Sequence, residues 1–206
     1  MTSVITGDII KSRGFKDQDI WLNQLKSALA MLSDDSSNYE IYRGDSFQLE
    51  HKGYLGSLFA VIYLKACIKS IKGLDVRMAI GIGNKSYQGK TVSESNGEAF
   101  VFSGETFETL KKEKLNLKVK TENFNLDQEL NLYFKLALIA MDNWTVNSAE
   151  IVKLSLENPN MIQSELAKLV GISQDAVSKR QKRAYLDEIK ELNLIYRHKI
   201  ETLKNA

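Results

Sequence analysis

Apolar and polar residues alternate along the first part of the chain in a way that predicts strands separated by helices. An apolar run at residues 4–7 ends in Gly-Asp, and a run at 76–82 first alternates and then turns apolar; both are typical of buried strands. Shorter runs at 39–42 and 47–49 flank the sequence Arg43-Gly44-Asp45-Ser46, which favours a hairpin turn. These runs predict a sheet in which the second and third strands are neighbours.

Segments with apolar residues at helical spacing lie between and after these strands. Residues 17–32 have one apolar face, and residues 54–71 are apolar enough to form a buried helix. Residues 98–112 predict a further helix and 115–119 an alternating strand, whereas the Gly-, Ser- and Asn-rich segment 84–97 predicts a loop. The β-α-β-β-α-β order of the first elements favours an α+β fold, in the form of a ferredoxin-like sandwich.

The rest of the chain predicts helices. Residues 127–142 form an amphipathic pattern, and residues 147–157 predict another helix that Asn158-Pro159 stops. Trp144 is expected to be a core anchor, because aromatic side chains bury a large apolar area. We therefore divide the chain into an α+β domain at 1–124, a linker helix at 125–146 and an all-α domain at 147–206.

The all-α part contains the most informative motif of the chain. Residues 161–183 read MIQSELAKLVGISQDAVSKRQKR and are typical of two short helices around Gly171. A tight turn between helices favours glycine, and the small Ala167 permits a close crossing. Ser173 then supplies an N-cap for the second helix. The segment resembles the helix-turn-helix of bacterial transcription regulators and sigma-factor-like DNA-binding domains, although Arg180 stands where a buried aliphatic residue is usual.

The second helix of this motif has polar residues where a helix in a DNA major groove presents them. Lys179, Lys182 and Arg183 are predicted to contact phosphates, while residues nearer the start of the helix are better placed to contact base edges. The predicted DNA-binding residues are Gln174, Asp175, Ser178, Lys179, Lys182 and Arg183. The alternative is a helix-turn-helix that serves only packing or dimerisation.

Charge supports this interpretation through its distribution and not through its total. The net charge is only +2, yet residues 161–206 contain nine Lys/Arg against six Asp/Glu. Four of those basic residues lie between Lys179 and Arg183, as phosphate contacts would require. A solvated helix face is the simpler explanation of such a charge run.

The remaining composition bears on the compartment. Cys67 is the single cysteine, which excludes a disulfide framework and a cysteine-based zinc site and fits a reducing cytoplasm. The first residues do not have the pattern of a signal peptide. Residues 54–71, interrupted by Lys65 and Lys69, are too polar to span a membrane. We therefore expect a cytoplasmic protein without a membrane partner.

Two aspartates of the predicted sheet are candidates for chemistry. Asp8 is expected at the end of the first strand and Asp45 in the hairpin, so their carboxylates would be close in a βαββαβ sheet. Such a pair is what Mg²⁺ or Mn²⁺ needs to bridge a triphosphate. Backbone amides after Asp8, together with Lys11 and Arg13, would hold phosphates at a strand-to-helix turn. Taken alone, each Gly-Asp pair is better explained as a local turn than as a metal site.

Four short motifs, in this order and spacing, resemble the SatD-like family of bacterial proteins and, more distantly, the palm-type domains of class III nucleotidyl cyclases and GGDEF enzymes. The resemblance covers roughly residues 1–120, and its motifs are VITGDIIKSR, EIYRGDSFQLE, VRMAIGIG and NGEAFVFSGETFETL. It implies that Asp8, Asp45 and the Ile9 carbonyl bind metal. It further implies a phosphate or nucleotide site at Lys11, Ser12, Arg13 and Gly44.

The sequence departs from the cyclase pattern at positions that matter for catalysis. Arg43 and Ser46 replace the first glycine and the acid of the Gly-Gly-Asp-Glu-Phe signature. Val101 stands at the position of a cyclase asparagine, and neither Gly104 nor Glu105 can replace the transition-state arginine. Loss of one such charge-stabilising donor costs about 3–4 kcal/mol. The resemblance therefore implies nucleotide binding without efficient cyclisation.

Three functions are consistent with these features. The first is a homodimeric, ligand-responsive transcription regulator that binds double-stranded DNA and whose cyclase-like domain binds a nucleotide with a divalent metal. The second is an active metal-dependent nucleotidyl cyclase or nucleotidyltransferase with a regulatory DNA-binding domain. The third is an assembly module that binds neither DNA nor nucleotide. We favour the first.

Overall fold

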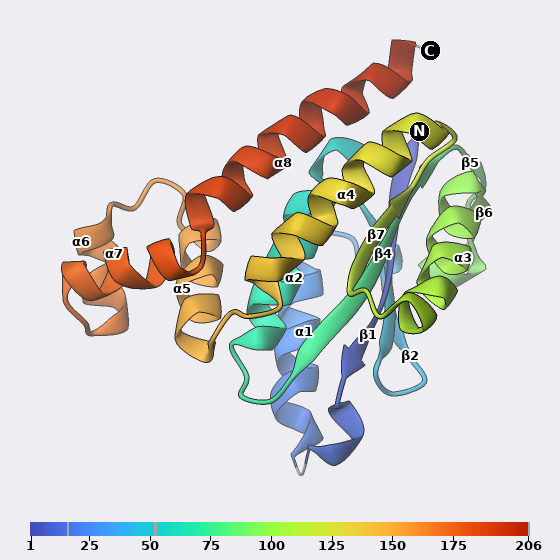
Figure 1. Cartoon of the computed structure of the whole chain (residues 1–206). Coiled ribbons are helices and arrows are strands. Elements are labelled where there is room, and N and C mark those ends of the chain that lie inside the picture. Colours follow the sequence, from blue (N-terminus) through green and yellow to red (C-terminus); the bar gives the residue numbers. More distant parts are fainter. Residues whose placement is uncertain (16, 52, 206) are drawn as a thin grey trace.

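The chain folds around a central sheet with helices on both faces, as the computed structural model in Figure 1 shows for residues 1–15, 17–51 and 53–205. Within these residues the main sheet has the strand order β2-β3-β1-β4-β7. β1 is antiparallel to both β3 and β4, and β4 is parallel to β7. The fold is therefore α+β, as predicted. The strands are β1 (Thr2–Ile10), β2 (Tyr39–Tyr42), β3 (Ser46–His51), β4 (Asp75–Gly83) and β7 (Leu117–Lys120).

Successive side chains of β1 project alternately into two apolar layers, one on each face of the sheet. Ile5 and Ile9 belong to the main core with α1 (Gln18–Leu32) and α2 (Ser57–Lys69). Val4 projects to the other face and packs with residues of α3 (Glu98–Glu113). Gly81 allows that helix to approach β4, because a Cβ atom there would lie 2.1 Å from the Ala99 carbonyl oxygen.

The predicted loop at 84–97 contains short regular structure. β5 (Lys85–Tyr87) pairs with β6 (Asn96–Gly97) in a small separate ladder. The loop prediction was therefore incomplete, because this local pairing has no apolar alternation to reveal it. Single 3-10 turns complete the connections: η1 (Ser12–Gly14), η2 (Ser36–Asn38), η3 (Tyr54–Gly56), η4 (Val92–Glu94) and η5 (Thr202–Asn205).

The predicted linker helix is an integral part of the fold. It is α4 (Phe124–Met141), which runs along β7. Its Asn131 amide caps the edge of the sheet, accepting from the Val119 backbone N–H at 2.8 Å and donating to the Val119 carbonyl at 2.9 Å. These bonds satisfy backbone groups that an edge strand would otherwise leave unpaired.

The C-terminal part consists of α5 (Val146–Glu157), α6 (Gln163–Val170), α7 (Gln174–Arg183) and α8 (Leu186–Glu201). The last of these helices, α8, is absent from the predicted elements, and it runs back beside α4 across the molecule (Figure 1). The hydroxyls of Tyr196 in α8 and Ser57 in α2 are hydrogen-bonded at 2.7 Å, and both residues are fully buried. One apolar cluster joins residues of the sheet with residues of α5 and α8, so the core is continuous across residue 146.

No helix in the described part of the chain is both long and apolar enough to cross a lipid bilayer.

Candidate nucleic-acid interface and the charged cavity beside it

The predicted helix-turn-helix is present as α6 and α7. Gly171 joins them with φ of 74°, and its N–H donates to the Ala167 carbonyl. The Ser173 hydroxyl caps α7 by accepting from the Ala176 N–H at 3.1 Å. A separate apolar cluster then holds this unit together, and it consists of Ile151 from α5, Leu166 and Ala167 from α6, and Val177 from α7.

Arg180, the departure from the usual motif, makes a polar contact in place of an apolar one. Its guanidinium donates to the Glu150 carboxylate on α5 at 3.1 Å. The neighbouring Gln181 donates to Ser155 of α5 at 3.0 Å and accepts from Gln163 of α6 at 2.9 Å. Polar side chains on the inner side of α7 therefore fasten it to both other helices.

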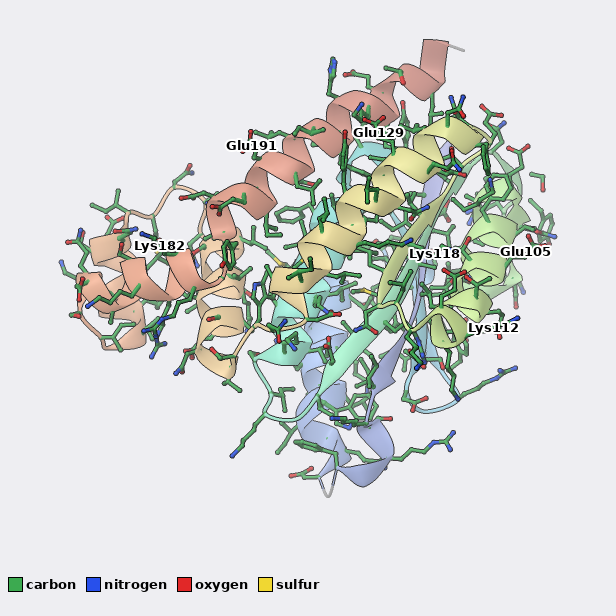
Figure 2. The ribbon with its side chains drawn as sticks, viewed as in Figure 1. Glu105, Lys112, Lys118, Glu129, Lys182 and Glu191 are labelled. Carbon is green, nitrogen blue, oxygen red and sulfur yellow. The ribbon has the colours of Figure 1, made fainter. Side chains whose placement is uncertain are left out.

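The outer side of α7 is open to solvent. All the predicted DNA-binding residues are exposed: Gln174, Asp175, Ser178, Lys179, Lys182 and Arg183. Lys182 on α7 lies at the opposite end of the molecule from Lys112 on α3 (Figure 2). Asp175 and Lys179 form an ion pair at 2.7 Å, but their side chains are 73% and 64% exposed. Such an exposed pair is weak and leaves both groups available to another partner.

The predicted metal ligand Asp8 is held by an arginine. It lies within β1, which continues to Ile10, and it faces Arg77 across the β1–β4 ladder. Arg77 donates through Nε to Oδ1 at 3.1 Å and through a terminal nitrogen to Oδ2 at 2.5 Å. The guanidinium also lies 5.8 Å from the ring centre of Phe107 in α3. A bidentate pair of this kind engages both carboxylate oxygens.

Asp45 has different contacts. Its carboxylate accepts a hydrogen bond from the Ser12 hydroxyl at 2.6 Å, and its carbonyl accepts one from the Ile9 N–H at 3.0 Å. The ladder pairs Asp8 with Ser46, so Asp45 lies opposite Ile9, and adjacent strand positions project to opposite faces. In the described residues no hydrogen bond or ion pair joins Asp8 to Asp45, and no group of three or more His, Cys, Asp or Glu is arranged to hold a metal.

The predicted phosphate-binding residues have three different environments. Ser12 is buried and committed to Asp45. Arg13 and Gly44 are exposed, and Gly44 has a left-handed backbone in the β2–β3 turn. Lys11 is also exposed, but it lines a cavity of about 620 Å³ at this end of the sheet.

This cavity lies between the sheet and the start of α5. Its walls come from the ends of β1, α2 and α3, the first residues of β4, and the segment that leads into α5. The lining includes four cationic side chains, two carboxylates and an indole: Lys11, Lys69, Arg77, Lys114, Asp75, Asp142 and Trp144.

A buried charge network forms one wall of the cavity. The ammonium group of Lys65, which is 1% exposed, donates to Asp75 at 2.8 Å and to Asp142 at 2.6 Å. Lys69 donates to the other Asp75 oxygen at 3.2 Å and to the Asp142 carbonyl at 2.7 Å. Asn116 donates to the remaining Asp142 oxygen at 3.0 Å. These bonds link α2, β4 and the residue after α4, and they satisfy charges that would be costly to bury unpaired.

Trp144 connects the cavity to the helix-turn-helix. The side chain is 5% exposed, as expected of a core anchor. Its indole N–H donates at 2.8 Å to the carbonyl of Ala184, the C-cap residue that follows α7. The cavity wall and the candidate DNA-binding helix therefore share a direct hydrogen bond.

Sequence reasoning missed the charged wall and the arginine. Lys65 and Lys69 were treated as polar interruptions of a buried helix, although charges four residues apart in an apolar helix indicate buried partners. Arg77 lies in the alternating run at 76–82, and nothing in that run assigns it a partner. Its pairing with Asp8 depends on the register between distant strands, which the local pattern does not specify.

Two further side chains of reactive types, Cys67 and His51, both have local structural environments. Burial raises the pKa of the Cys67 thiol to about 11, so the reactive thiolate is scarce at neutral pH. Burial also lowers the pKa of His51, whose Nδ1 lies 3.2 Å from the Gly53 carbonyl oxygen. Both residues are explained by local packing.

Comparison of the chain with protein-family models, with curated proteins and with solved structures finds no match. A functional assignment therefore rests on the residues and contacts described above.

Proposed function

We propose that this protein is a DNA-binding transcription regulator that reads DNA with α7. The observation that carries the proposal is the division of that helix into two sides. The inner side is fixed to α5 and α6 by Val177, Arg180 and Gln181. The outer side leaves every predicted contact residue exposed. A rigidly supported helix with a polar, cation-rich outer side suits insertion into a major groove.

Contacts with DNA follow from the positions along α7. Lys179, Lys182 and Arg183 supply charge for phosphates, and Gln174 and Ser178 lie nearer the helix start, where base edges are approached. Asp175 is exposed, so its ion pair with Lys179 can be replaced by a hydrogen bond from a donor on a base edge. Affinity is therefore expected to be mainly electrostatic and sensitive to salt.

For the N-terminal part we infer a ferredoxin-like, palm-type domain that binds a phosphate-bearing ligand without cyclising it. The antiparallel order β2-β3-β1-β4, with α1 and α2 together on one face, supports the ferredoxin-like arrangement. The bidentate contact of Arg77 with Asp8 supports a non-catalytic role, because a metal at Asp8 would have to displace the guanidinium.

We further infer that the protein is a homodimer in the cytoplasm. Helix-turn-helix proteins generally read two half-sites about one helical turn apart. An apolar groove of about 690 Å³ between α4 and α8 supports a second copy as the occupant, since Leu136 and Ile139 beside it are 58% and 68% exposed. Arg183 and Tyr185 line the same groove, so it adjoins the end of α7.

Removal of the three cationic residues of α7 tests DNA binding. The variant Lys179→Ala/Lys182→Ala/Arg183→Ala is expected to bind genomic DNA fragments at least about tenfold more weakly, and to lose about one unit of salt slope per phosphate contact. Electrophoretic shift and fluorescence anisotropy at several salt concentrations measure both quantities.

The matched control removes the same charge elsewhere. Lys26, Lys111 and Lys112 are exposed on α1 and α3, and their triple alanine variant is expected to bind DNA like the wild type. Equal, weak binding by all three proteins at every salt concentration would contradict the proposed function.

A further inference from the structure

Two lysines that line the charged cavity have left-handed backbone, and their side chains make no hydrogen bond or ion pair with any other described residue. Lys11 and Lys114 both line the cavity and have φ of 69° and 55°. Lys69 and Arg77 are already engaged by carboxylates, whereas neither Lys11 nor Lys114 contacts a carboxylate of the described chain. Two uncommitted ammonium groups therefore lie at one opening.

The backbone at Lys114 would suit glycine better than lysine. Lys114 follows α3, its N–H donates to Lys111, and the N–H of Leu115 donates to Leu110 at 3.0 Å. This is a Schellman arrangement, in which the left-handed residue is usually glycine because a Cβ atom is disfavoured there. Residues with strained backbone concentrate at functional sites, where the side chain is needed for binding or catalysis.

The surroundings of the cavity favour an anion. The lining residues and their ion-pair partners comprise Lys11, Lys65, Lys69, Arg77 and Lys114 against Asp8, Asp75 and Asp142, an excess of two positive charges. Thr145 and Val146 also line it, so the N-terminus of the twelve-residue helix α5 faces the same space. The exposed N–H groups of a helix start attract negative charge.

We propose that this cavity binds a small polyphosphate-bearing molecule, with Lys11 and Lys114 as the principal cations. A volume of about 620 Å³ accommodates a nucleotide-sized ligand, since small-molecule sites commonly span about 300–1,000 Å³. A diphosphate or triphosphate group supplies the multiple negative charges that two lysines, Arg77 and the start of α5 can share. Asp45 does not line this cavity, so the site is separate from the Asp45 carboxylate.

The same site can act on DNA binding, and this step rests on the proposed function. Trp144 lines the cavity and holds the carbonyl of Ala184 at the end of α7. A ligand that shifts Trp144 or the start of α5 changes the position of α7 relative to the sheet. Ligand binding therefore changes DNA affinity if the ligand binds more tightly to one position of α7 than to another. The change cannot exceed this difference in ligand affinity.

Calorimetric titration of the full chain with sodium pyrophosphate, in magnesium-free buffer, tests the site. Lys11→Gly/Lys114→Gly removes both charges and suits both left-handed positions, so this variant is expected to keep or raise its melting temperature while binding at least about tenfold more weakly. The control Lys111→Ala/Lys112→Ala removes the same charge from the adjacent turn of α3 and is expected to bind like the wild type. Absence of binding by the wild type, or equal binding by the diglycine variant, overturns the site.

DNA affinity with and without pyrophosphate, at constant ionic strength, tests the coupling. We expect a change for the wild type and none for Lys11→Gly/Lys114→Gly. Pyrophosphate binding without any change in DNA affinity overturns the regulatory step. If no DNA fragment is bound under any condition, the proposed function fails, while the calorimetry still decides the cavity.

Discussion

Gly171 and Gly104 both have open surroundings but different backbone conformations, so substitution at each has a different consequence for stability. Gly171 adopts φ of 74° in the turn between α6 and α7, and a Cβ atom there would meet no neighbour within 4 Å. Glycine is required at this position by the backbone angle alone. Gly104 lies within α3 with equally open surroundings but ordinary helical angles. Gly171 and Gly104 therefore separate two effects of glycine: it permits positive φ, and it destabilises a helix interior.

Alanine at these two glycines is expected to change stability in opposite directions. Gly171→Ala should lower the free energy of unfolding by about 1–2 kcal/mol, because alanine is strained at positive φ. Gly104→Ala should raise it by about 0.5–1 kcal/mol, because glycine is disfavoured inside a helix. Urea unfolding of both variants measures the difference. A shift of the same sign in both would show that the turn tolerates ordinary backbone angles.

At the scale of elements, the contact between α8 and α2 includes one buried hydrogen-bonded pair, Tyr196 and Ser57. The Ser57 hydroxyl donates to the Tyr54 carbonyl at 2.8 Å, so its single hydrogen is committed. Tyr196 must then be the donor in its 2.7 Å bond to Ser57. Burial raises the pKa of Tyr196, which keeps that hydroxyl protonated.

This direction of donation predicts unequal costs for the two partners. Tyr196→Phe removes the donor and leaves Ser57 bonded to Tyr54, so it should cost about 1 kcal/mol. Ser57→Ala leaves the buried phenol hydroxyl unpaired and should cost about 1–3 kcal/mol. The double variant is expected to cost less than the sum of the two, as measured by chemical denaturation. If the two single variants lost equal free energy of unfolding, and the double variant lost their sum, the assignment of Tyr196 as the donor would be contradicted.

Much of the element order was predictable because it follows local periodicity. The predicted helix at 17–32 corresponds to α1, and the alternating run at 76–82 to β4. A helix at α8 could also have been predicted, because its buried apolar residues have helical spacing: Leu186, Ile189, Tyr196 and Ile200. The packing position of α8 could not be predicted from its local sequence, because its partners lie in the distant elements α2 and α4.

The candidate interface was more predictable than the cavity. Gly171 and Ser173 serve a turn and a cap whose requirements are local, so their roles follow from the sequence. The cavity instead assembles Lys11, Arg77 and Lys114 from three separate segments. The distances between such residues depend on the sheet register and on how α3 ends, and neither is encoded within a short window.

At the scale of the whole molecule, the exposed apolar residues Leu136 and Ile139 of α4 lead us to expect self-association. Leu136→Glu/Ile139→Glu places charge in the groove between α4 and α8 and is expected to convert the proposed dimer to a monomer. Val101→Glu on α3 is the control, because that side chain is also exposed but lies on the other side of the sheet. Light scattering and sedimentation measure the mass. A monomeric wild type, or a dimeric double variant, would contradict the interface.

The continuous core also limits how this chain could change its proposed DNA target. Residues Leu186, Ile189 and Tyr196 pack with the part of the molecule that precedes residue 146. A recombination event that exchanged the C-terminal helices would have to bring matching partners for α8 as well. Under the proposed function, DNA-binding specificity is therefore expected to diversify through point changes on the outer side of α7, with exchange of the C-terminal helices disfavoured.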